Sequence, residues 1–359
     1  MNDEMTSKER IKAAVKFEEH DRVPVFPLTH WGVPGLFGIS VEEYTKNPEV
    51  QAKCDIDACK QIGYDGINVG VDVIIEAEAF EGSKTRFSKD GPPFLIAHPL
   101  GEDKNKLYNL KIKNPETSGR MATQIKTAKI VVDEVGKDTY ILAWIMGPLN
   151  CASQLRGVQD TVIDFVLDTK YLEDLLDFAT EQVLVYGRSL ARAGVDCIGI
   201  GEALASPSFS SPESISKYVF PRYKKLISGL HEEGVDTLIH ICGDIYPIFD
   251  YGDKIGKNLF TQEAGTDIVD IDWEVDMKDA IERTGLCCRG NLNPSDAILS
   301  GTKEKVLADA KKVILNAGPT KGLILGSGCD CSYYTPKENY RAMVEASKKW
   351  GVYPISENF

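Results

Sequence analysis

Nine consecutive residues decide the fold of this chain: Asp236-Thr237-Leu238-Ile239-His240-Ile241-Cys242-Gly243-Asp244. They predict a short buried strand at 237–241, followed by a glycine turn. Because residues i and i+2 project to the same side of a strand, His240 and Cys242 can emerge together from its carboxyl end. An imidazole and a thiolate on one side supply two of the four ligands that a zinc ion takes.

A second stretch, Gly326-Ser327-Gly328-Cys329-Asp330-Cys331, follows another apolar segment at 322–325. Its small residues allow a close approach of the backbone, and Cys329 comes directly after a glycine. We therefore hypothesise that His240, Cys242 and Cys329 bind one zinc ion at the open end of a barrel. The spacing is wider than in a zinc finger, so the fold has to bring two distant strand ends together.

These residues also have a simpler interpretation. A single cysteine is more often a small buried hydrophobic side chain than a ligand, and a single histidine is more often a hydrogen-bonded core or surface residue. Cys331 is an alternative ligand to Cys329, although the glycine before Cys329 favours the latter. The other cysteines are interpreted as structural: Cys54, Cys59, Cys151, Cys197, Cys287 and Cys288.

The composition is that of an ordinary globular protein, with 359 residues of which 43% are hydrophobic and 26% charged. A net charge of −13 and a pI near 5.0 argue against a nucleic-acid partner bound through its phosphates. The polar start of the chain does not resemble a signal peptide, and no apolar run approaches the ~20 residues of a membrane span. Nine cysteines without an export signal indicate a cytoplasmic protein with reduced thiols.

Short apolar strands alternate with helical segments along the chain. We expect strands at 23–28, 66–70, 140–146, 195–200, 237–241, 267–271, 286–289 and 323–325. Eight such units predict an α/β fold, a single (β/α)₈ TIM barrel that forms one domain over residues 1–359. An N-terminal helix after a capping box at Thr6 and Glu9 precedes it, and a hairpin insertion at 82–114 follows strand 2. A doubly wound sheet is the alternative, but the first strand–helix turn lacks a Gly-x-Gly-x-x-Gly fingerprint.

Four helical segments carry further signals. Residues 41–62 predict a helix with Gly63 as its C-cap, and residues 160–192 predict a helix in two pieces. A helix from Ser211 to His231 is expected to kink at Pro221. Thr335-Pro336-Lys337-Glu338 resembles a capping box before the last helix.

Polar residues follow several of the expected strands, where barrels place their sites. Asp72 and Glu202 are the candidate catalytic residues. His30, Asn150 and Asn291 are candidates for binding substrate. Each can instead be a strand-end cap or a loop hydrogen bond.

Several motifs together resemble one known family. They are Asp21-Arg22-Val23-Pro24-Val25, Val73-Ile74-Ile75-Glu76-Ala77-Glu78-Ala79, Ile239-His240-Ile241-Cys242-Gly243-Asp244, Gly290-Asn291-Leu292-Asn293-Pro294 with Gly301-Thr302, and Gly328-Cys329 leading to Thr335-Pro336-Lys337-Glu338-Asn339-Tyr340. They span nearly the whole chain in the order of the uroporphyrinogen decarboxylase superfamily. Within it, the chain resembles the cobamide-dependent methyltransferases of the methylcobamide:coenzyme M type. The resemblance implies the same barrel.

The two branches of this superfamily differ in their chemistry. The decarboxylases have an arginine-rich stretch after the first strand that neutralises the carboxylates of a tetrapyrrole, without a metal. This chain has no arginine between Arg22 and Arg86, so it would bind a polycarboxylate poorly. In the methyltransferases a His-x-Cys pair and a distant cysteine hold zinc, and those positions match His240, Cys242 and Cys329. A metal-free decarboxylase remains the alternative.

The methyltransferase resemblance implies three further expectations. The fourth zinc position is taken by a carboxylate that yields to substrate, and Glu263, Asp272 and Glu274 are the candidates. The methyl group moves between a corrinoid (cobalamin) and a small thiol or methylated substrate, in a direction that the sequence leaves open. Nothing here resembles a cobalamin-binding domain, so a separate corrinoid-binding protein has to supply the cofactor. A homodimer is compatible with a barrel of this size.

Overall fold

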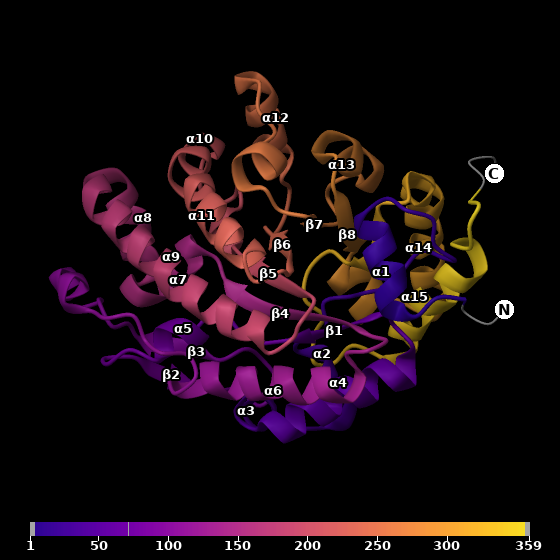
Figure 1. Cartoon of the computed structure of the whole chain (residues 1–359), viewed down its shortest axis with the longest axis horizontal. Coiled ribbons are helices and arrows are strands. Elements are labelled where there is room, and N and C mark those ends of the chain that lie inside the picture. Colours follow the sequence, from indigo (N-terminus) through magenta and orange to yellow (C-terminus); the bar gives the residue numbers. More distant parts are fainter. Residues whose placement is uncertain (1–3, 71, 356–359) are drawn as a thin grey trace.

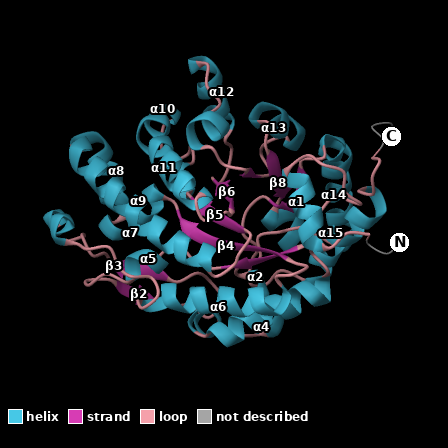
Figure 2. Ribbon diagram, in the orientation of Figure 1, coloured by secondary structure: helices cyan, strands magenta, loops and turns pink. Residues whose placement is uncertain are grey.

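A computed structural model describes residues 4–70 and 72–355 of the chain. Its centre is a parallel seven-stranded sheet, in which each strand pairs with the next in the order β1-β4-β5-β6-β7-β8-β9. The strands are β1 (Gly66–Val69), β4 (Tyr140–Met146), β5 (Cys197–Gly201), β6 (Asp236–His240), β7 (Ile268–Ile271), β8 (Cys287–Leu292) and β9 (Leu323–Ser327). The sheet curls into a half-barrel, and helices form a layer around it (Figures 1 and 2).

The first of the eight expected strands, 23–28, is not a strand of this sheet. It makes a single parallel bridge, Val25 with Leu325, and the backbone N–H of Phe26 donates to the carbonyl of Leu325 at 2.8 Å. Pro24 and Pro27 have no N–H to donate, so a continuous ladder cannot form through them. The prediction of eight regular strands was therefore wrong at this segment.

The helices of the outer layer are α1 (Ser7–Val15), α2 (Gly32–Phe37), α3 (Val41–Lys46), α4 (Pro48–Ile62), α5 (Ile75–Glu78), α6 (Gly119–Val135), α7 (Pro148–Arg156), α8 (Val158–Leu167), α9 (Thr169–Arg192), α10 (Pro212–Ser214), α11 (Phe220–His231), α12 (Tyr246–Ile255), α13 (Met277–Thr284), α14 (Lys303–Ala317) and α15 (Lys337–Trp350). Short 3₁₀ turns are η1 (Lys104–Asn109), η2 (Ala203–Ala205) and η6 (Gly318–Thr320), and π-helical turns are η3 (Ile215–Val219), η4 (Leu259–Ala264) and η5 (Pro294–Leu299). None of these described helices combines the length and the apolar character that a bilayer span requires.

Several local signals are confirmed and others are corrected. The capping box at Thr6 and Glu9 is formed, and Gly63 ends α4 in the left-handed conformation. The helix expected at 41–62 is two helices, because the chain turns at Asn47, which caps α4. The π-turn η3 comes just before Pro221, which lacks the N–H that a continuous α-helix needs.

The capping box expected at 335–338 does not form. Helix α15 begins at Lys337 after Pro336, and no side chain caps it. Within the expected excursion 82–114, β2 (Lys84–Arg86) pairs antiparallel with β3 (Phe94–Ala97).

The inner face of the sheet is built in layers. One layer is apolar and includes Leu142 on β4, Leu238 on β6 and Ile268 on β7, against which Ile11 of α1 packs. Two residues further along the strands, on the same face, lie the polar or aromatic side chains Trp144, His240, Asp270 and Arg289. The site therefore begins one layer above a closed hydrophobic core, toward the carboxyl ends of the strands.

A buried ion cluster holds the 23–28 segment against the amino-terminal end of β1. Asp65 receives hydrogen bonds from Arg10 at 2.6 Å, from Arg22 at 2.9 Å and from the backbone N–H of Val25 at 2.7 Å. All three side chains are buried. Replacing Asp65 by alanine removes this carboxylate from two buried guanidinium groups, so we expect a loss of about 3–5 kcal/mol in the free energy of unfolding, measured with urea.

The control for this prediction is Asp57→Ala, which removes an exposed pair with Lys53 and should cost under ~1 kcal/mol. A similar small loss for Asp65→Ala would contradict the role given to the cluster.

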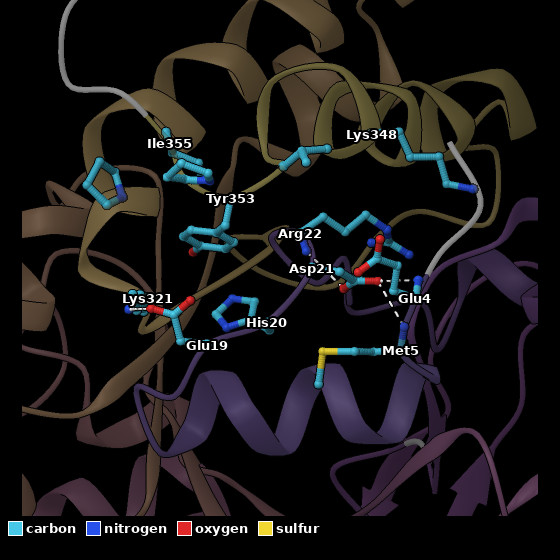
Figure 3. Close-up of a pocket in the computed structure, with 13 residues that line it drawn as sticks. Glu4, Met5, Glu19, His20, Asp21, Arg22, Lys321, Lys348, Tyr353 and Ile355 are labelled. Atoms are coloured by element: carbon cyan, nitrogen blue, oxygen red, sulfur yellow. Dashed lines mark hydrogen bonds and ion pairs between the residues drawn. The ribbon is translucent and has the colours of Figure 1, made fainter.

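A cavity of about 990 Å³ lies at the opposite, amino-terminal end of the strands (Figure 3). His20, Arg22, Lys321 and Tyr353 contribute to its wall. His20 and Arg22 precede the 23–28 segment, Lys321 precedes β9, and Tyr353 follows α15. Barrel enzymes instead have their active sites at the carboxyl ends of the strands. We therefore place the site elsewhere.

Candidate metal centre

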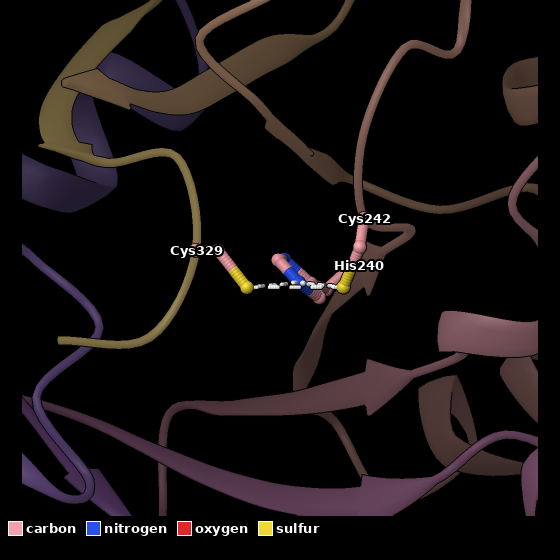
Figure 4. Close-up of side chains that lie close together, drawn as sticks. All are labelled: His240, Cys242 and Cys329. Atoms are coloured by element: carbon pink, nitrogen blue, oxygen red, sulfur yellow. Dashed lines mark hydrogen bonds between the residues drawn. The ribbon is translucent and has the colours of Figure 1, made fainter. Parts of the chain in front are cut away.

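His240, Cys242 and Cys329 come together in the structure (Figure 4). His240 Nε2 lies 3.2 Å from Cys242 Sγ and 3.7 Å from Cys329 Sγ, and the two sulfurs are 3.8 Å apart. The strand β6 carries His240 at its end, and Gly243 turns the chain after Cys242 with φ of +80°. Two stretches separated by 87 residues thus aim three ligand atoms at one point.

The triangle fits zinc. A tetrahedral ion with Zn–S of about 2.3 Å and Zn–N of about 2.0 Å separates two sulfurs by ~3.8 Å and a sulfur from a nitrogen by ~3.6 Å. The observed distance between the two sulfurs, 3.8 Å, and that between Cys329 Sγ and His240 Nε2, 3.7 Å, match these values. The distance between Cys242 Sγ and His240 Nε2, 3.2 Å, is slightly shorter than expected. One imidazole and two thiols are also ligand types that zinc prefers. His240 is buried, and both cysteines are partly exposed, so one side stays open to a small molecule.

Two residues that the sequence analysis did not single out support His240. The register aligns His240 with Asp270 and Asp270 with Arg289 on successive strands. His240 Nδ1 lies 3.0 Å from Asp270 Oδ2, and Arg289 donates to both oxygens of Asp270 at 2.7 and 2.6 Å. A carboxylate on Nδ1 fixes the ring so that Nε2 faces the metal position.

The protons on this cluster follow from its contacts. Burial disfavours the charged imidazole, but the hydrogen bonds to Asp270 and Cys329 outweigh it and raise the pKa of His240 to about 10. The hydrogen bond with Cys242 and burial raise the pKa of the Cys329 thiol. Without a metal the cluster therefore retains protons that zinc has to displace, so zinc binding releases protons.

Asp272 links the two ligand-bearing loops. Its carboxylate accepts hydrogen bonds from the backbone N–H of Gly243 at 2.7 Å and of Trp273 at 2.9 Å. Gly328 approaches so closely that a Cβ there would lie 2.4 Å from Asp272 Oδ1. The carboxylate thus stands between the residue after Cys242 and the residue before Cys329.

None of the three candidate fourth ligands belongs to the compact ligand group found among the described residues. Asp272 is committed to the loop contacts above. Glu263, which lies on η4, forms an ion pair with Lys257 at 2.7 Å. Glu274 lies beside Gly243. The identity of a fourth ligand stays a prediction.

His30 lies beside this centre. Its Nδ1 is 2.8 Å from Asp330 Oδ2, next to Cys329 in the chain. Its ring packs edge-on against Trp144 at 5.3 Å, and Trp144 packs in the same way against His240 at 6.1 Å. The buried Nε2 of His30 has no hydrogen-bond partner among the described residues. Its predicted role in binding substrate stays a prediction that this position favours.

The other predicted site residues have structural partners. Asp72 forms an ion pair with Arg120, which also binds Glu78. Asn291 donates to the carbonyl of Val275 at 2.7 Å. Asn150 donates to the carbonyl of Gly201 at 3.2 Å and accepts from the N–H of Leu204 at 3.1 Å. Their roles toward substrate stay predictions, and these contacts give each residue a second function in holding loops.

Glu202 holds the start of α7. It is buried and accepts hydrogen bonds from the backbone N–H groups of Leu149 and Asn150, the first turn of that helix. Gly147 permits this approach, since a Cβ there would lie 2.1 Å from the carboxylate. Burial raises the pKa of Glu202 to about 8, although the two N–H donors work in the opposite direction. Its catalytic role stays a prediction.

This raised pKa predicts a pH dependence of stability. Between the ordinary value of 4.5 and about 8, the folded protein holds a proton that the unfolded chain has lost. The free energy of unfolding should therefore fall as the pH rises through this range. Urea unfolding at a series of pH values tests this.

The Glu202→Gln variant should show a shallower slope. Part of the slope should remain, because burial also raises the pKa of Glu76 to about 7. A slope that is the same in Glu202→Gln and in the wild type would refute the assignment.

Comparisons with known proteins match the chain over nearly its whole length. A family model described as uroporphyrinogen decarboxylase (URO-D) matches residues 6–350. A methylcobamide:CoM methyltransferase MtbA from Methanosarcina mazei is 29% identical over 97% of this chain and 99% of its own. The MtaA protein of the same description from Methanosarcina barkeri is 28% identical with the same coverage. A uroporphyrinogen decarboxylase from Carboxydothermus hydrogenoformans is 23% identical over 84% of this chain and 83% of its own.

Two solved structures are similar to this chain over nearly its whole length. A methyltransferase from Methanosarcina mazei superimposes with a TM-score of 0.85 and 27% identity, covering 96% of this chain and 99% of the other. A B12-independent methionine synthase from Shewanella has a TM-score of 0.58 at 14% identity, over 91% of this chain and 96% of the other. The second likeness shows the fold alone.

Proposed function

Because this chain belongs to the uroporphyrinogen decarboxylase family, we propose that it catalyses the chemistry of the methyltransferase branch of that family. The proposed reaction moves a methyl group between a corrinoid protein and a small thiol or methylated substrate, with zinc as the metal. Similarity to methylcobamide:CoM methyltransferases over nearly the whole chain supports this. The observation that carries the proposal is the triangle of His240 Nε2, Cys242 Sγ and Cys329 Sγ, in which both cysteines are partly exposed.

Some residues of the site would bind the metal, and others orient its ligands. His240, Cys242 and Cys329 would hold zinc, and Asp270 orients the imidazole. Asp272 keeps the two cysteine-bearing loops at a fixed separation. A zinc ion here would lower the pKa of a thiol at the open position, or polarise the heteroatom of a methylated substrate. His30 and Asp330 lie where the remainder of a small substrate would be bound.

The decarboxylase alternative has less support from the side chains. A tetrapyrrole polycarboxylate needs exposed arginines, and two arginines near the carboxyl half of the sheet are instead buried in ion pairs. Arg289 binds Asp270 and Arg120 binds Asp72. The corrinoid-binding partner and the cytoplasmic location belong to the same proposal, and all nine cysteines as free thiols agree with a reducing compartment.

The proposal is tested by metal analysis together with a thiol assay. We expect close to one zinc per chain, and zinc-dependent loss of the methyl group of free methylcobalamin when a small thiol such as 2-mercaptoethanesulfonate is added. Cobalt(I) formation is followed by absorbance. A protein that holds no zinc and releases carbon dioxide from a uroporphyrinogen would instead establish the decarboxylase alternative.

A further inference from the structure

Helix α8 presents an apolar side to solvent. The side chains of Val166 and Leu167 are 79% and 77% exposed, and three more of its apolar residues are exposed as well. We call the set the α8 apolar face: Val158, Val162, Ile163, Val166 and Leu167. Its members lie on one side of the helix at a spacing of three to five residues. Contiguous exposed apolar surface of this kind marks an interaction site more often than a single exposed residue does.

The opposite side of α8 faces the protein and carries both polar and apolar side chains. Asp164 is buried and forms ion pairs with Arg156 at 3.1 Å and with Lys104 at 3.5 Å. Phe165 packs edge-on against Tyr218, with their ring centroids 5.9 Å apart. These contacts hold the orientation of α8, so the α8 apolar face is directed outward by the fold.

The α8 apolar face lies at the same edge of the sheet as the metal centre. Helix α7 begins at Pro148, two residues after the end of β4, and α8 follows directly. His240 ends β6, which is separated from β4 only by β5. Two strand spacings of about 4.8 Å and the nine residues of α7 at about 1.5 Å place the first residue of α8 within roughly 25 Å of the metal centre. In Figure 1, α8 stands at one end of the row of helices that includes α10 and α11.

Three exposed aromatic side chains lie in the loops at the same edge of the sheet. Phe209 follows β5, Trp273 follows β7 and Tyr334 follows β9, and all three are exposed. Trp273 is the neighbour of Asp272, which links the two ligand-bearing loops. Trp and Tyr are among the residue types that contribute most to protein–protein affinity.

We propose that the α8 apolar face, together with Phe209, Trp273 and Tyr334, is the docking surface for the protein that carries the corrinoid. This inference rests on the proposed function, because it needs a reactant that arrives on a second protein. An interface of standard size buries about 800 Å² on each partner, a disc of roughly 30 Å. Such a disc can extend from the metal centre to the start of α8. A partner seated there presents its corrinoid to the open side of the zinc site.

The test compares protein-bound and free corrinoid as substrates of the double variant Val166→Glu/Leu167→Glu. The probe is a methylcobalamin-loaded corrinoid protein from the same organism, chosen as the one that the wild type demethylates fastest. We expect the KM for it to rise at least about tenfold, since two carboxylates enter an apolar contact. The Kd measured by titration calorimetry should rise equally. Turnover of free methylcobalamin, which does not use the surface, should stay within about twofold of the wild type.

The control is Lys129→Glu on α6, an exposed residue whose replacement changes the net charge by the same two units. It should leave both substrates unaffected. Unchanged KM and Kd for the corrinoid protein in the double variant would overturn the inference, as would a dimer that the double variant separates into monomers while docking persists. If the wild type demethylates neither protein-bound nor free methylcobalamin, the proposed function itself is wrong. The docking surface, which rests on that function, would then be refuted as well.

Discussion

Replacing Cys329 by alanine is expected to abolish both zinc binding and methyl transfer while the protein stays folded. The thiol is one of three ligands, so its loss leaves two, too few to hold the ion against solvent. The side chain is partly exposed at the end of the sheet, so the free energy of unfolding should change by less than about 1 kcal/mol. His240→Ala should have the same effect on zinc. Elemental analysis, the methylcobalamin assay and urea unfolding measure the three quantities.

Cys331 provides a matched control for this prediction. It is two residues away, fully buried, and was the alternative ligand, but it lies outside the ligand group. Cys331→Ala should retain zinc and activity and lose some stability through the small cavity it leaves. If Cys331→Ala loses the metal and Cys329→Ala keeps it, the ligand assignment is wrong. Loss of folding in Cys329→Ala would indicate a structural metal instead.

Neutralising Asp270 is expected to weaken zinc binding and to destabilise the fold at the same time. Asp270→Asn removes the negative charge that orients His240, which should lower zinc affinity by about 10–100-fold. It also leaves Arg289, a fully buried guanidinium, without its carboxylate. Leaving a buried charge unpaired costs about 3–5 kcal/mol. Zinc competition with a chromogenic chelator and urea unfolding give the two values.

The double variant Asp270→Asn/Arg289→Met separates the two effects. Removing both charges should restore much of the stability, while the zinc affinity stays low because the imidazole still lacks its carboxylate. Asp250→Asn on α12 is the control, since Asp250 pairs with Arg283 at the surface and its replacement should cost under ~1 kcal/mol. Wild-type zinc affinity in Asp270→Asn would show that the ring needs no such support.

The pairing of His240 with Cys242 could be predicted from sequence, because their i, i+2 spacing follows from strand geometry. The approach of Cys329 to that pair could be predicted only through the barrel, which brings two distant strand ends together. Asp270 and Arg289 could not be paired in the same way, because their contact depends on the register between three strands. The available signal was a charged residue inside each of two buried strands, a position that demands a partner.

The strand-end residues show the complementary difficulty. Asp72, Glu202, Asn150 and Asn291 follow strands as catalytic residues of barrels do, and the sequence cannot distinguish this from capping. Glu202 illustrates the point, because its partners are the first N–H groups of a helix whose position only the fold determines. Pro24 and Pro27, by contrast, were a readable signal against a regular strand at 23–28. The outward orientation of α8 likewise depends on ion pairs with Lys104 and Arg156, which lie elsewhere in the chain.

X-ray absorption at the zinc edge of the purified protein tests the central claim most directly. We predict a single zinc environment with one nitrogen at about 2.0 Å and two sulfurs at about 2.3 Å. On addition of a small thiol, a third sulfur should enter at a similar distance. A zinc with no sulfur neighbours, or one with four protein ligands that a thiol leaves unchanged, would contradict the account.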